Sequence, residues 1–151
     1  MNDPIAPEAL LQWRLRLISH LFFYSSATIV RDAWLKGIQH VGWGWFPAED
    51  CCAWFDDLFV KAGPDWALQE GRINKSEYNL IMPFHEAFRK VCDEEETDAK
   101  KLLASPALSR LIDVGEQACK KLPHVIKGEA EKEFVRVITK SAAPFWSSNR
   151  Y

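Results

Sequence analysis

Apolar side chains recur at steps of three and four residues along almost the whole chain, and this spacing constrains the fold most strongly. Residues at such steps lie on one face of an α-helix. No segment shows four or more residues of clear apolar and polar alternation between turns, the pattern of a half-buried strand. The sequence therefore predicts an all-α protein, a single-domain bundle of five to seven helices over residues 1–151.

Capping residues and prolines indicate where the expected helices begin. Proline suits the first turn of a helix, where its missing N–H needs no partner. Asn74 with Glu77 three residues later has the spacing of a capping box. Pro83 lies inside the helix that this box opens, and we expect it to kink that helix. The expected starting points are Pro7, Ser25 or Ser26, Pro47, Asn74, Thr97, Ser105 followed by Pro106, and about Glu129.

The apolar stripes also predict the buried face of each helix and some of its ends. Gly42 and Gly44 are expected to end the second helix, and the segment AGPDW at 62–66 is expected to end the third. The predicted inward residues are Val30, Trp34, Ile38 and Val41 in the second helix, Tyr78, Ile81, Met82, His85, Phe88 and Cys92 in the helix from Asn74, and Ala130, Phe134, Val137 and Ile138 in the last.

Cysteine usage and the N-terminal sequence indicate the cellular compartment. The four cysteines fit no C-x-x-C frame, and the neighbours Cys51 and Cys52 meet disulfide geometry badly. The first twenty residues lack the order of regions found in a signal peptide, and the longest apolar runs are far short of a membrane span. We therefore expect a reduced, cytoplasmic protein without a membrane partner, whose thiols act as small apolar side chains.

The charge balance bears on the class of partner. A formal net charge of −2 argues against a general nucleic-acid binder, so no direct nucleic-acid partner is predicted. The charge is uneven: residues 1–100 hold ten basic and sixteen acidic side chains, and residues 101–151 hold nine and five. The first two thirds of the chain can therefore attract a basic partner, or can simply be a solvated acidic surface.

The segment GWGWFPAEDCCAWFDDLF, residues 42–59, is the strongest candidate for a functional site. On a helix from Pro47, one side carries Cys51, Phe55 and the apolar residues that follow, and the acids lie along its two flanks. Acids seven residues apart are two turns apart, roughly 10 Å, too far to share a proton. The candidate partner-binding residues are Trp43, Trp45, Glu49, Asp50, Trp54, Asp56 and Asp57.

Three interpretations of this segment remain open. It is a packed helix with a charged outer face, or a recognition face for Lys and Arg of a partner, or part of a carboxylate site. The third needs acids from another helix, such as Glu77 or Glu86, and a histidine such as His85. The motif H-E-x-x-H is broken because Arg89 stands at its last position. We predict no catalytic residue, metal or cofactor, and a helical metalloprotein or hydrolase is the alternative.

The stretch WGWFPAEDCCAWFDDLF followed by INKSEYNLIMPFHEAF resembles small helical bacterial proteins of the immunity type. Such proteins bind and neutralise a cognate toxin. The resemblance covers roughly residues 15–92 and rests on aromatic clusters, acids and a capped helix. It implies a non-catalytic protein inhibitor that binds a basic toxin domain, although the mild acidity departs from what a nuclease target requires. A homo-oligomer that uses the surplus tryptophans as a self-interface is a third possibility.

Overall fold

The computed structural model describes residues 7–41, 47–59 and 63–146 of the chain. Within these residues every regular element is helical, with eight α-helices, three short 3-10 helices and no strand. The all-α prediction is therefore confirmed, and the arrangement is compatible with a single-domain bundle. The predicted number of helices is wrong, because the structure has eight where the sequence suggested five to seven.

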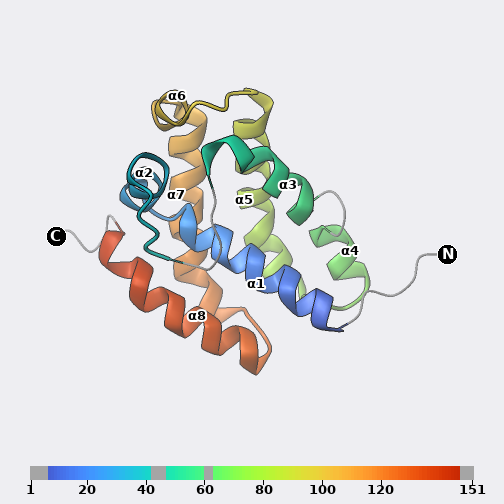
Figure 1. Cartoon of the computed structure of the whole chain (residues 1–151). Coiled ribbons are helices and arrows are strands. Elements are labelled where there is room, and N and C mark those ends of the chain that lie inside the picture. Colours follow the sequence, from blue (N-terminus) through green and yellow to red (C-terminus); the bar gives the residue numbers. More distant parts are fainter. Residues whose placement is uncertain (1–6, 42–46, 60–62, 147–151) are drawn as a thin grey trace.

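Figure 1 shows the eight α-helices of the described residues in chain order. They are α1 (Pro7–Phe23), α2 (Ala27–Lys36), α3 (Cys51–Phe59), α4 (Pro64–Gln69), α5 (Lys75–Asp93), α6 (Ala99–Leu103), α7 (Pro106–Lys121) and α8 (Glu129–Ala142). The 3-10 helices are η1 (Ala48–Asp50), η2 (Leu122–His124) and η3 (Ala143–Phe145).

The two long helices α5 and α7 pack side by side (Figure 1). Helix α1 packs against both α7 and α8. The short helices α3 and α4 both pack against α5. A cluster of aromatic rings from the end of α1 and the middle of α5 is fully buried where these layers meet. Phe22, Phe23, Tyr24, Phe84 and Phe88 belong to it.

Helix α4 is the element that sequence reasoning missed. The segment around Gly63 and Pro64 was expected only to end the third helix, and instead Pro64 begins α4 with Asp65 in the first turn. The residue that cannot continue one helix is well suited to start the next, because the first turn needs no N–H from proline.

Helix α2 ends earlier than predicted. Gly37 adopts the left-handed conformation with φ 69° and donates its N–H to carbonyls of the last turn. This is the usual C-terminal role of glycine, and it lies five residues before Gly42. Ile38 therefore falls outside the helix and is 46% exposed, so its predicted inward place is wrong, whereas Val41 is buried as expected.

The buried faces of α5 and α8 are displaced from the predicted ones. In α5 the centre of the face includes Phe84 and Val91, and His85 and Cys92 are only half-buried. In α8, Val137 is 51% exposed and Ala130 is exposed, so both predictions are wrong. The α8 face is shifted because the charged Glu131 turns inward to meet a cation; the residues buried there are Glu131, Val135, Ile138 and Ala142.

The capping signals are largely confirmed. Asn74 and Glu77 form both hydrogen bonds of the capping box at the start of α5. Ser105 caps α7 as predicted, but α6 is capped by Asp98 and not by Thr97. Helix α5 runs through Pro83 without interruption.

Candidate functional site

The inner side of α3 anchors this helix on α5. Cys51, Phe55, Leu58 and Phe59 are buried, as the sequence predicted. The Phe55 ring lies 5.3 Å from that of Phe88, so the helix is held by aromatic contacts in the core. The opposite side of α3 is therefore the side that faces outward.

The outward side of η1 and α3 carries three exposed carboxylates, Glu49, Asp50 and Asp56, named the acidic stripe below. Ala53 is exposed between them, at the helical spacing that joins residues 49, 53 and 56 into one row. No cation of the chain lies within ion-pair range of these three carboxylates in the described structure, and residues 47–59 contain no Lys, Arg or His. The charge of the acidic stripe is therefore not compensated by any residue that the structure describes.

Trp54, a candidate contact residue, does not project freely into solvent. It is half-buried and packs on the core, with its ring centroid 5.3 Å from that of the fully buried His20. A partner can contact only its exposed part. Of the other predicted contact residues, Trp43, Trp45 and the side chain of Asp57 lie outside the described residues.

A second acidic segment, residues 93–98 with the sequence DEEETD, lies at the same end of the bundle as the acidic stripe. Helix α6, which follows this segment, packs against η1 (Figure 1). Asp93 pairs with Arg89 at 2.9 Å and the Ser105 hydroxyl donates to Glu94 at 2.6 Å, whereas Glu95 is exposed. In the sequence Asp56 and Asp93 are 37 positions apart, and only the fold brings the two acidic segments to one end.

Thiols lie beneath the acidic stripe, and they are poor nucleophiles. The Cys52 thiol lowers the pKa of Cys51, but contact with Cys92 and burial raise it, with a net rise to about 12. Contact with Cys51 and burial also raise the pKa of Cys52. Because the thiolate is the reactive form, these protonated thiols do not support nucleophilic catalysis at neutral pH.

The residues proposed for a metal or hydrolase site have other partners in the structure. Glu77 is part of the capping box and pairs with Arg14 at 2.7 Å, and Glu86 pairs with Arg89. His85 packs between the rings of Phe55 and Phe59, and burial lowers its pKa. Within residues 7–41, 47–59 and 63–146, no three His, Cys, Asp or Glu side chains are placed to hold a metal ion.

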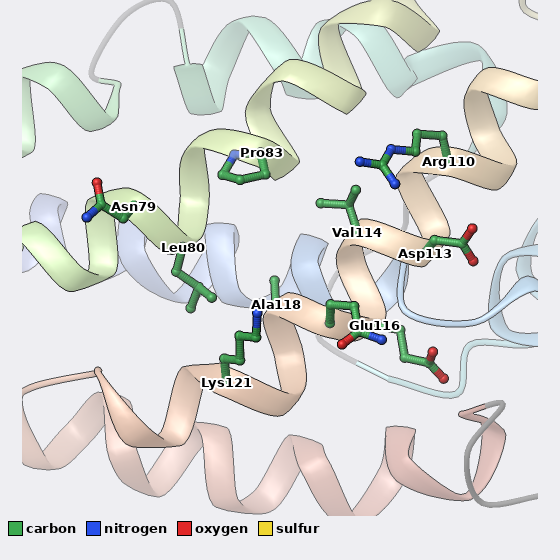
Figure 2. A pocket seen from close by; sticks show the side chains of 10 residues that line it. Asn79, Leu80, Pro83, Arg110, Asp113, Val114, Glu116, Ala118 and Lys121 are labelled. Atoms are coloured by element: carbon green, nitrogen blue, oxygen red, sulfur yellow. The ribbon is translucent and has the colours of Figure 1, made fainter.

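A groove between α5 and α7, which sequence reasoning missed, is a further candidate for binding (Figure 2). It has a volume of about 480 Å³, and its walls mix aliphatic, amide and charged side chains. Arg110 and Lys121 line it, and neither has an ion-pair partner among the described residues. Among the described residues, its lining contains no serine, cysteine or histidine.

No family model matches this chain, and no curated protein or solved structure matches it either. None of the helices in the described parts of the chain is both long and apolar enough to cross a bilayer.

Proposed function

We infer that this protein is a non-catalytic binding domain that recognises a basic surface of a protein partner through the acidic stripe. The observation that carries this inference is the group of exposed carboxylates, Glu49, Asp50 and Asp56, none of which pairs with a cation among the described residues. Other exposed acids among the described residues do have a cation on the same helix, such as Glu133 with Arg136 on α8 and Glu86 with Arg89 on α5. An uncompensated row on a firmly packed helix is suited to a partner's Lys and Arg.

Two further features support a binding role. Ala53 separates the carboxylates, so a partner can approach the helix backbone closely at the centre of the stripe. The segment at 93–98 extends the negative potential over the same end of the bundle. Both features favour fast, salt-dependent association with a positively charged protein.

The specific form of the proposal is that the partner is a toxin and that this protein neutralises it in the bacterial cytoplasm. The support is the resemblance of residues 15–92 to immunity-type proteins, together with a surface suited to binding and thiols unsuited to catalysis. Binding alone neutralises a toxin when the bound surface covers or distorts its active site, so no catalytic group is required.

The test uses a charge-reversed variant in a pull-down from lysates of the source organism. We expect Glu49→Lys, Asp50→Lys and Asp56→Lys together to abolish capture of a partner that the unchanged protein retains. The matched control reverses three exposed acids on other elements, Glu70, Glu129 and Glu133, and should capture the partner normally. Equal capture by both variants would refute the role of the acidic stripe.

A growth assay then tests the neutralising role. Expression of the captured partner alone should arrest growth, and co-expression with the unchanged protein should restore it. Co-expression with the stripe-reversed variant should fail to restore growth. A partner that is harmless when expressed alone would contradict the toxin hypothesis and leave the binding role standing.

A further inference from the structure

We propose that a pocket where α3, α4 and α5 meet receives the guanidinium group of an arginine side chain of the protein partner. The pocket has a volume of about 240 Å³ and is lined by Phe59, Gly63, Pro64, Asp65, Trp66, Met82 and His85. It lies at the opposite end of α3 from η1, so one partner surface running along this helix reaches both. The proposal rests on the inferred protein-binding role and names the residue type that the partner presents.

Three aromatic rings, a thioether and one carboxylate give the pocket the chemistry of a cation site. Phe59, Trp66 and His85 supply the rings, and the Phe59 ring meets that of His85 edge-on at 4.7 Å. Aromatic faces attract cations through their quadrupoles, and the attraction strengthens when the cation loses water. A planar guanidinium is weakly hydrated and stacks on such rings better than an ammonium does.

Asp65 supplies the only formal charge among the described residues that line the pocket. The Tyr78 hydroxyl donates to Oδ1 of this carboxylate at 2.6 Å, which holds it in place and leaves the other oxygen available. The nearby cation Lys75 lies over the Tyr78 ring, 4.7 Å from its centroid, and forms no ion pair with Asp65. This oriented carboxylate pairs with no cation among the described residues and is open to a charge-assisted hydrogen bond from a ligand.

His85 supplies a second acceptor. Its Nδ1 is buried without a hydrogen-bond partner, and no described residue hydrogen-bonds to the other ring nitrogen. Burial lowers its pKa, so the ring is neutral at pH 7 and one nitrogen keeps a lone pair. A guanidinium has five N–H donors, so one group can bond to Asp65 and to His85 while its face covers an aromatic ring.

The experiment uses the methyl resonance of Met82, because the chain has only two methionines and this one lines the pocket. Protein labelled with ¹³C at the methionine methyl groups is titrated with N-acetyl-arginine methylamide. We expect a saturable shift of the Met82 resonance, with a Kd on the order of 1 mM for a ligand this small. The Met1 resonance serves as the comparison.

Two matched ligands test the chemistry. The citrulline analogue has nearly the same shape without the charge, and the lysine analogue has the charge without the planar group. We expect both to bind at least about threefold more weakly than the arginine analogue. No saturable shift of Met82, or equal affinity for arginine and either analogue, would overturn the proposal.

Matched variants locate the bound group. Asp65→Asn keeps the shape and the acceptor for Tyr78 but removes the charge, and we expect about tenfold weaker binding of the arginine analogue. Glu133→Gln, at an exposed position on α8, should leave the affinity unchanged. Equal affinity of Asp65→Asn and the unchanged protein would place the guanidinium elsewhere and refute the assignment.

Failure of this proposal is distinguishable from failure of the proposed function. If the arginine analogue does not bind but reversal of the acidic stripe abolishes partner capture, only the pocket assignment is wrong. If the analogue binds as expected but the stripe reversal leaves capture unchanged, the pocket assignment is supported and the role of the acidic stripe is refuted.

Discussion

Replacing Arg14 by methionine should destabilise the protein strongly, because this guanidinium joins three helices. It bonds to Glu77 of α5 at 2.7 Å and approaches Glu131 of α8 at 3.4 Å, from its own position on α1. It also donates to the backbone carbonyl of Arg72 at 3.1 Å. Methionine keeps much of the apolar stem and removes the charge, so the variant isolates the electrostatic contribution.

The expected loss follows from the burial of the two carboxylates that remain. Their side chains are 4% and 10% exposed, and that of Arg14 is 12% exposed. Removing one partner of a buried ion pair leaves an uncompensated charge and costs about 3–5 kcal/mol. We expect a loss in this range in the free energy of unfolding at pH 7.

The loss should depend on pH, with a sign set by Glu77. Burial raises the pKa of Glu77, and Arg14 opposes that rise. In the variant the pKa of Glu77 rises further above its unfolded value. A carboxyl whose pKa is higher in the folded state than in the unfolded state binds its proton first in the folded state as the pH falls. The folded state of the variant therefore regains stability at lower pH. The loss should therefore be smaller at about pH 5 than at about pH 7, by about 1.4 kcal/mol for each unit of further rise.

Urea denaturation followed by circular dichroism measures these free energies. Arg136→Met is the matched control, because its pair with Glu133 is more than half exposed and should contribute little. Adding Glu77→Gln to Arg14→Met removes one stranded charge and keeps a residue suited to the capping box, so it should restore part of the loss. A loss below about 1 kcal/mol at pH 7, or the same loss at both pH values, would refute the reasoning.

Two further predictions concern packing and pH. A Cβ on Gly115 would lie 2.4 Å from the carbonyl oxygen of Tyr24, so Gly115→Ala should lower the free energy of unfolding by about 1–3 kcal/mol in urea denaturation, and a rise would contradict the close approach of α1 and α7. Burial lowers the pKa of His20 to about 4, so unfolding takes up a proton below the ordinary pKa of 6.5. The His20 contribution therefore decreases as the pH falls from about 6.5 to about 4, by up to about 3 kcal/mol, and urea titrations of His20→Phe should show a weaker decrease.

Local signals in the sequence were sufficient for much of the helical architecture. The capping box of Asn74 and Glu77 and the start at Ser105 depend on hydrogen bonds between residues three or fewer positions apart. The inner face of α3 follows from helical spacing alone, and its buried residues are those predicted. Where a second local signal competes, prediction fails, as at Gly37, which ends α2, and Pro64, which begins α4.

Long-range contacts decided the features that the sequence left open. Glu131 is buried because Arg14 lies opposite, 117 residues away in the chain, and this ion pair turns the face of α8 away from the predicted one. Similarly, Trp54 is partly enclosed because His20 lies beside it.

The sequence by itself determined that this protein is helical, where most of its helices begin and which side of α3 is apolar, because these properties depend on neighbours along one helix. Only the tertiary structure brought the segment at 93–98 to the end of the bundle that carries η1, and placed Asp65, Trp66 and His85 in the lining of one pocket. The physical reason is that helical periodicity sets the direction in which a side chain points around the axis of its helix. Which neighbour that side chain meets depends on how separate helices pack.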